Sequence, residues 1–375
     1  MKRARWSGRR AAAGIALLAL LGGCATPSRF QDPPRRPADV RAEIVRLLPP
    51  ETADRDGWAT DVHAAFAALD IEPTTNNLCS ALAVTQQEST FNHDPAVPGL
   101  AKIARGEIDR RAEQMHVPQL LVSGALRLRS SDGSSFGERL EEVRTEHDLS
   151  RIYEEFIGMV PLGQRLLAGS NPVRTGGPMQ VSIDFAQQHA QERPYPYPTA
   201  GSIRDEVFTR RGGMYFGIAH LLGYPASYDQ PLYRFADFNA GWYASRNAAF
   251  QSAVTLASGI PLELDGDLIR HAARRGDAAP GATELAVGSL SRELQMDPAQ
   301  IRRDLERSDR LEFESTVLHQ RLFDVAERIE GRSLPRAVMP RIRLSSPKIT
   351  RELTTEWFAK RVDERHRRCM KRGGR

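Results

Sequence analysis

The sequence has few cysteines and lacks the short motifs that mark common metal, nucleotide and redox sites. Among its 375 residues are three cysteines, and no CxxC pair occurs. There is no G-x-x-x-x-G-K-[ST] loop and no H-E-x-x-H pair, and the nine histidines are scattered. Phosphate loops, zinc proteases and thiol redox centres need these spacings. We therefore predict no metal and no cofactor.

A surplus of positive charge is also absent once the first 23 residues are set aside. These hold five of the 52 Lys and Arg residues and none of the 47 Asp and Glu residues, so the remainder carries both signs in equal number. Binding to nucleic acid depends largely on excess cationic side chains. The composition therefore predicts no nucleic-acid partner.

Residues 1–23 have the pattern of a signal peptide: basic MKRARWSGRR, apolar AAAGIALLALL and then small residues. The apolar run is short for a membrane-spanning helix. LGGC, ending at Cys24, resembles the bacterial lipobox, which implies a lipoprotein acylated on Cys24. Ala25 after it implies the outer membrane, with the protein on the periplasmic side or exposed at the surface. The alternatives are a plain secretory signal or an anchor helix.

Helical periodicity dominates after a Pro- and Arg-rich tether at 24–39. The patterns predict helices over 40–48, over 57–71 with Trp58, Val62, Phe66 and Leu69 on one stripe, and over 74–91 with an N-cap at Asn76 or Asn77. A further helix is expected across 138–160. Alternating strand patterns are few, so the fold class is mostly α.

Cys79 and Cys369 remain after Cys24, in an oxidising compartment. They either form a disulfide bond, which would tie the C-terminal tail to the segment before Glu88, or are two unrelated thiols. The basic run from Lys360 to Arg375 is expected to be a solvated tail, with contact to an anionic lipid as the alternative.

Three short segments follow one another in the chain: Glu88-Ser89-Thr90-Phe91, Gly177-Pro178-Met179-Gln180 and Phe238-Asn239-Ala240-Gly241. A glycine- and leucine-containing helix, MYFGIAHLLGY, lies between the last two. In this order they resemble the lysozyme-like lytic transglycosylases, which show E-S-x-F, G-L-M-Q and A-Y-N-A-G. Pro178 and Phe238 depart from that pattern, and the gap between the first two segments is long.

The resemblance implies a goose-type, lytic transglycosylase-like helical domain over 40–255, with an insert at about 92–175. A helical C-terminal extension would follow over 256–375. Over its whole length the chain also resembles the YaiW-type outer-membrane lipoproteins, a family linked to uptake of peptide antibiotics. The C-terminal stretch LPRAVMPRIRLSSPKITRELTTEWFAKRVDERHRRC contributes to this second resemblance.

The implied activity is cleavage of peptidoglycan glycan strands with Glu88 as general acid and base. A partly buried carboxyl group suits this role because burial raises its pKa. Ser89, Met179, Gln180 and Asn239 would bind the substrate. A hydrolase would need a second carboxylate, for which Asp94, Asp184 and Asp237 are candidates. An aromatic face or hydroxyl could come from four tyrosines, Tyr195, Tyr197, Tyr228 and Tyr243.

Two other functions remain open. The chain could be a non-catalytic lysozyme-like lipoprotein that binds cell-wall glycan or assists uptake of a peptide. It could also be a structural lipoprotein of an envelope complex, although the sequence indicates no particular protein partner. An insert that covers the cleft beside Glu88 would favour the non-catalytic function.

Overall fold

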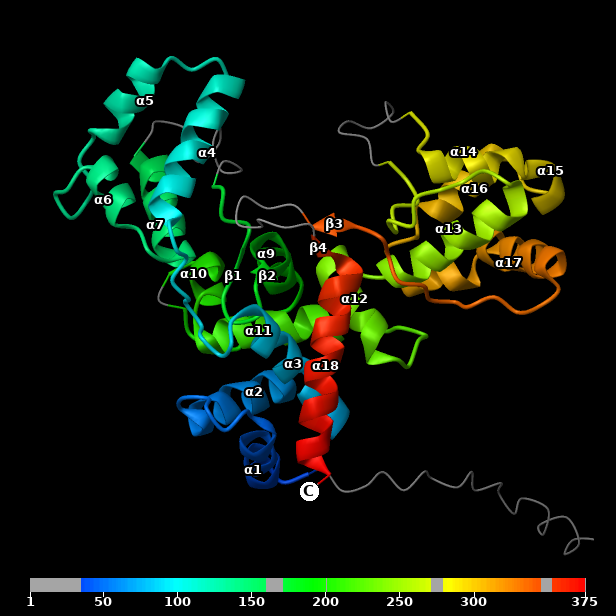
Figure 1. Cartoon of the computed structure of the whole chain (residues 1–375), viewed down its shortest axis with the longest axis horizontal. Coiled ribbons are helices and arrows are strands. Elements are labelled where there is room, and N and C mark those ends of the chain that lie inside the picture. Colours follow the sequence, from blue (N-terminus) through cyan, green and yellow to red (C-terminus); the bar gives the residue numbers. More distant parts are fainter. Residues whose placement is uncertain (1–34, 160–170, 200, 271–278, 345–352, 375) are drawn as a thin grey trace, which may run out of the picture. The chain divides into compact units, whose positions relative to one another are not determined.

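The structure, a computed structural model, describes residues 35–159, 171–199, 201–270, 279–344 and 353–374, and the elements below all belong to the unit that begins at Pro37. Most of these residues are helical, as predicted, and the strands are two short antiparallel pairs (Figure 1). The pairs are β1 (Thr175–Gly176) with β2 (Val181–Ser182), and β3 (Arg343–Leu344) with β4 (Leu353–Thr354).

The first three helices follow the predicted patterns closely. They are α1 (Pro37–Leu47), α2 (Arg55–Leu69) and α3 (Thr75–Glu88). The predicted stripe of α2 is buried, from Trp58 at 3% exposure to Val62 at 0%. The predicted N-cap of α3 is wrong, because the Thr74 hydroxyl accepts the hydrogen bond from the Asn77 backbone N–H at 3.1 Å. A threonine one residue outside the helix can do this, whereas Asn76 and Asn77 already lie within it.

Within residues 92–175, the described parts (92–159 and 171–175) contain four helices: α4 (Leu100–Gln114), α5 (Gln119–Leu126), α6 (Phe136–Glu142) and α7 (Glu146–Met159). The single helix expected across 138–160 is therefore two. The helical conformation is interrupted before α7. There the Asp148 N–H donates to the Thr145 hydroxyl at 3.1 Å, and the Thr145 N–H donates to the Asp148 carboxylate at 3.3 Å. Such reciprocal bonds satisfy the free N–H groups of a new helix start.

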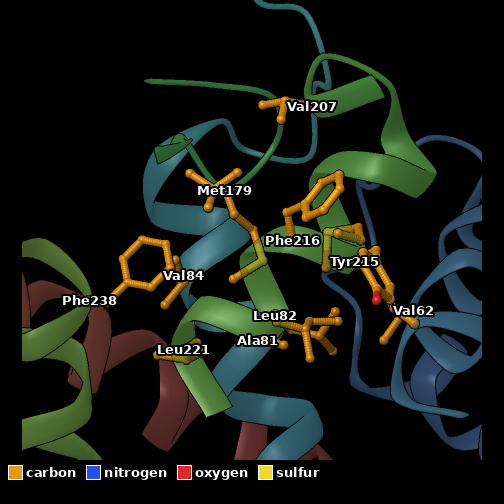
Figure 2. Packing of buried hydrophobic residues seen from close by; sticks show 14 of the residues in the cluster. Val62, Ala81, Leu82, Val84, Met179, Val207, Tyr215, Phe216, Leu221 and Phe238 are labelled. Atoms are coloured by element: carbon orange, nitrogen blue, oxygen red, sulfur yellow. The ribbon is translucent and has the colours of Figure 1, made fainter. Parts of the chain in front are cut away.

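A large apolar cluster surrounds α11 (Arg210–Leu222), which is buried along almost its whole length. The helices α9 (Ile183–Glu192), α10 (Ile203–Val207) and α12 (Pro231–Ala240) belong to the same part of the chain. Figure 2 shows Tyr215, Phe216 and Leu221 of α11 among residues of this cluster from α2, α3 and the β1–β2 turn. Helix α11 is thus an element against which both α3 and the β1–β2 turn pack.

A second apolar cluster is formed by buried residues between Ala249 and Ala326, within the described parts of that range. Its elements are α13 (Ala244–Ser258), α14 (Ala282–Ser289), α15 (Ser291–Leu294), α16 (Pro298–Leu305), the 3-10 helix η2 (Leu311–Ser315) and α17 (Val317–Glu330). Arg246 of α13, 1% exposed, donates to the carbonyl of Arg310 at 2.8 Å and lies over the rings of Tyr243 and Phe313. The buried residues of this second cluster begin at Ala249, within α13.

The C-terminal helix α18 (Thr355–Gly373) returns to the first cluster and lies along α3 and α12 (Figure 1). Phe358, Val362 and Cys369 are at most 4% exposed, and a disulfide bond joins Cys369 to Cys79 of α3, with 5.5 Å between their Cα atoms. The expectation of a solvated tail is therefore wrong for the described residues. One face of this basic helix is apolar and is part of the core.

We expect the disulfide bond to stabilise the fold considerably. It closes a loop of 290 residues and so restricts the unfolded chain. Replacing Cys79 and Cys369 together by alanine should lower the free energy of unfolding by roughly 2–5 kcal/mol in urea titrations. Wild-type protein unfolded and titrated under reducing conditions should match the variant, and equal stability of oxidised wild type and variant would contradict the prediction.

Candidate functional site

Glu88 is the last residue of α3, and the chain turns sharply after it. Thr90 and Phe91 both have positive φ angles, of 52° and 61°. Non-glycine residues rarely adopt such angles, and those that do are often found at functional sites. The Phe91 ring meets Trp58 of α2 edge to face, with 5.3 Å between the ring centroids. Packing against α2 therefore stabilises the turn that ends the helix beside Glu88.

Ser89 connects the first sequence motif to the second. Its hydroxyl lies 2.8 Å from the carbonyl oxygen of Pro178 and 3.1 Å from that of Thr85, and it can donate to either. Segments 89 residues apart in the chain are thus held together directly at the end of α3. Ser89 was predicted to bind substrate, and in the structure its hydroxyl contacts the backbone of the Gly177–Gln180 turn.

That turn connects β1 to β2 and contains two positive φ angles, at Gly177 and Gln180. A Cβ atom on Gly177 would lie 2.0 Å from the carbonyl oxygen of Val207, so only glycine fits there. Gln180 is partly exposed, and its side-chain oxygen accepts from the Thr175 hydroxyl at 3.1 Å. Its side-chain nitrogen donates to the Gly177 carbonyl oxygen at 3.4 Å, so each end of the amide has one partner within the turn and could bond one more.

Met179 was predicted to line a sugar cleft, and for its side chain this is wrong. The residue is fully buried and lies among the core side chains in Figure 2. A Cβ on Gly217 of α11 would come within 2.4 Å of the Met179 sulfur, so the glycine provides the space that this side chain fills. An apolar side chain following a tight turn gains more by packing against α11 than by facing water.

Asn239 lies near the end of α12 and is exposed, and its side-chain oxygen accepts from the Thr355 hydroxyl at 3.2 Å. Thr355 is the first residue of α18. The third motif is therefore joined to α18, which packs on α3, whereas the first two motifs touch each other directly. The preceding residue, Phe238, packs against the ring of His220 on α11, with 5.1 Å between the centroids.

The Glu88 carboxyl group has a pKa raised from 4.5 to about 7, because burial penalises its charged form. The positive charge of Arg365, on α18, opposes this shift. Among the described residues, no second carboxylate contributes to it. Glu88 is thus about half protonated near neutral pH, which suits a group that first donates and then accepts a proton.

The three aspartates considered as a second carboxylate lie in unrelated surroundings. Asp237 is fully buried and accepts hydrogen bonds from the Ser245 backbone N–H at 2.7 Å and from the hydroxyls of Tyr224 and Tyr228. Asp184 is exposed and faces Arg174 at 4.0 Å. Asp94 interacts with Thr145 and His147 next to α7, and its pKa is raised by partial burial.

The four tyrosines proposed for the cleft have structural contacts of their own. Tyr195 donates to Glu206 at 2.8 Å and packs against Tyr197, and Tyr228 donates to Asp237. Tyr243 stacks under the guanidinium of Arg246 at 4.1 Å. These contacts hold loops and helix ends together.

The sequence also contains G-S-S-F-G at 133–137, which has the spacing of a nucleophile elbow. In the structure Ser135 caps α6: its hydroxyl lies 2.9 Å from the Glu138 carboxylate and accepts from the Glu138 N–H at 3.2 Å. This capping box explains the serine.

Cys24 lies outside the described residues. Within the described ranges, no cluster of three or more His, Cys, Asp or Glu side chains could hold a metal ion.

Comparison with known proteins defines the family. A family model described as "Protein of unknown function (DUF1615)" matches residues 51–372. The chain belongs to this family. It is also 54% identical over 360 residues to "Uncharacterized protein YaiW" of Escherichia coli (strain K12), which covers 95% of this chain and 97% of that protein.

No solved structure matches the chain. The family assignment confirms the expected resemblance to YaiW-type proteins and leaves the lysozyme-like fold and the enzymatic activity as predictions. Across the ranges that the structure describes, every helix falls short of the length and apolarity that crossing a membrane requires.

The raised pKa of Glu88 predicts a stability difference that does not depend on any activity. Because the folded-state pKa lies near 7 and that of an unperturbed glutamate is 4.5, the native state should lose stability as pH rises through this interval and then level off. Glu88→Gln removes the charge. It should therefore be more stable than wild type by roughly 1–3 kcal/mol at about pH 9, and nearly equal to it at about pH 4. Urea titrations at both pH values check this, and an equal difference at both would contradict it.

Proposed function

We propose that this family member is an outer-membrane lipoprotein, anchored through Cys24, that cleaves peptidoglycan glycan strands as a lytic transglycosylase on a lysozyme-like domain. The observation that carries the proposal is the Glu88 carboxyl group. Its pKa, raised to about 7, keeps about half of the groups protonated near neutral pH, and it lies at a helix end joined to the second motif by the Ser89–Pro178 hydrogen bond.

The chemistry needs one carboxyl group. Glu88 would donate its proton to the glycosidic oxygen as that bond breaks and positive charge develops on the muramic acid ring. The resulting carboxylate would take the proton of the muramic acid C6 hydroxyl while that oxygen bonds to the anomeric carbon. The product is a 1,6-anhydro sugar, and Glu88 recovers its proton, so no second carboxylate is required.

Gln180 and Asn239 would bind the glycan beside Glu88. Both present amide groups at the surface, one on the β1–β2 turn and one at the end of α12. Amides can donate to and accept from sugar hydroxyls. Ser89 acts as a positioning residue because its hydroxyl is directed to the backbone of the second motif.

A second candidate function is glycan binding, or assistance to peptide uptake, without cleavage. The observation that favours it is Arg365: its positive charge acts on Glu88 and would oppose positive charge developing on a sugar close by. Burial of Met179 also reduces the surface that the second motif offers to a sugar.

Digestion of cell-wall sacculi separates the two functions. Wild-type protein should release anhydromuropeptides, and Glu88→Gln should reduce the rate at least about 100-fold, since it removes the proton donor and keeps the shape. Glu72→Gln, at an exposed glutamate before α3, is the matched control and should behave as wild type. If wild type and Glu88→Gln are both folded and inert but bind sacculi equally, the protein is a binding module and the enzymatic proposal fails.

The influence of Arg365 on Glu88 predicts a shifted pH profile. Since donation requires the protonated acid, the rate of anhydromuropeptide release should fall as pH rises through about 7. Arg365→Gln removes a charge that lowers the pKa of Glu88, so the midpoint of this fall should move to higher pH. Arg367→Gln, on the exposed face of α18 and paired with Asp363 at 2.8 Å, should leave it in place. An unchanged midpoint in Arg365→Gln would show that Glu88 does not control the profile.

A further inference from the structure

Helix α18 carries more positive charge than its own acids can pair. It has seven Lys and Arg residues and three Asp and Glu residues. Each acid already has a cation of its own, at 2.6, 3.1 and 2.8 Å in the pairs Lys360–Glu356, Arg361–Glu364 and Arg367–Asp363. Four cations are left over, among them Arg365 and Arg368, and within the described ranges neither of these two forms an ion pair.

Arg365 and Arg368 lie on the same face of α18, because residues three apart are neighbours on a helix. Arg368 is exposed and Arg365 is half-buried. The Nη1 atom of Arg365 donates to the carbonyl oxygen of Arg361 at 3.0 Å, whereas its Nε atom has no hydrogen-bond partner in the described part of the chain. The protein therefore uses few of the five donors that this guanidinium group offers.

This face of α18 borders the candidate site. Helix α18 packs along α3, whose last residue is Glu88, and the charges of Glu88 and Arg365 influence each other (Figure 1). Burial lowers the pKa of Arg365, and the positive charges of Arg361 and Arg368 lower it further. Like charges gathered on one face repel one another, and an anion bound there would relieve the repulsion.

The side chains around this face distinguish between two kinds of anionic partner. A helix that lies on a membrane presents large apolar side chains next to its cations. None of the large apolar side chains that are exposed in the described ranges lies on α18, since Phe358 and Val362 are buried in the core. The face therefore fits the anionic group of a soluble or cell-wall ligand better than a lipid bilayer.

We infer that Arg365 and Arg368 bind carboxylates of the peptide stems that peptidoglycan carries on its muramic acid residues. The inference rests on the proposed function, because it takes peptidoglycan as the ligand, and it names the part of that ligand that α18 recognises. Guanidinium groups bind carboxylates through charge-assisted, often paired hydrogen bonds. Asn239 already contacts Thr355, the first residue of α18, so a glycan strand bound at Asn239 has its stems next to this helix.

A bound stem would also change the electrostatic surroundings of Glu88. With its charge unpaired, Arg365 opposes the positive charge that develops on a sugar ring close by. A carboxylate held by Arg365 offsets this opposition. The same contact would thus make a stem-bearing muramic acid a better substrate than one without a peptide.

The test measures binding without cleavage, using the Glu88→Gln protein and the fluorescence anisotropy of labelled soluble glycan strands. Strands that keep their stem peptides are compared with strands from which an amidase has removed them. The stem-bearing strands should bind at least about tenfold more tightly, because charge-assisted hydrogen bonds form only with them. Raising the salt concentration should reduce this preference, since it screens exposed charges.

Variants of α18 assign the preference to particular side chains. Replacing Arg365 and Arg368 together by glutamine should abolish the preference and leave the affinity for bare strands unchanged. Replacing both by lysine keeps the charge without the planar fork and should restore part of the preference. The matched control is Arg367→Gln, whose cation is already paired with Asp363, and it should bind as the parent protein does. Circular dichroism checks that all variants are folded.

Three results would overturn the inference. Two are equal binding of both kinds of strand by folded protein and a preference that survives in the double glutamine variant. The third is binding to phosphatidylglycerol vesicles that the double glutamine variant loses and that stem-bearing strands do not displace, because the partner would then be a lipid head group.

Release of anhydromuropeptides from sacculi is measured separately, so the two proposals can fail independently. A protein that cleaves without preferring stem-bearing strands disproves the inference about α18 alone. A protein that prefers them without cleaving disproves the enzymatic proposal alone.

Discussion

The packing of α18 on α3 is the interaction on which the candidate site depends. Helix α3 supplies Glu88, and α18 covers its flank with Phe358, Val362 and the half-cystine Cys369, which is bonded to Cys79. A glutamate at the end of an isolated helix would be solvated and fully ionised at neutral pH. Here burial raises its pKa, and α18 contributes, through Arg365, the positive charge that limits the rise.

A second constraint comes from the glycines of α11. Gly213 leaves room for the Pro178 ring and Gly217 for the Met179 side chain, which a Cβ would approach to 2.3 and 2.4 Å. The turn that carries Gln180 can therefore lie directly on the helix, and Pro178 comes within hydrogen-bonding distance of Ser89. The second motif thus acts mainly through packing: it fixes the turn and exposes one amide.

Sequence reasoning was most reliable where one element determines its own structure. The stripe of α2, the end of α3 near Glu88 and the helical nature of the insert all follow from local periodicity. Sequence reasoning failed for α18, because its many cations suggested a solvated tail. The signal that could have shown its burial was the helical spacing of Phe358, Val362 and Cys369. Sequence reasoning also could not foresee that Met179 would be buried, because that depends on a glycine of a different helix.

The opposing influences on Glu88 bear directly on whether the site is catalytic. Burial alone would push the pKa of its carboxyl group above 7. The group would then be mostly protonated at neutral pH, but it would be a weaker proton donor and its ionised form would be costly to hold. Arg365 lowers that cost and brings the pKa back to about 7. Under the proposed cleavage, this balance would let one carboxyl group both give and take a proton near neutral pH. Under the alternative of glycan binding without cleavage, the same cation would serve only to offset the cost of the buried charge.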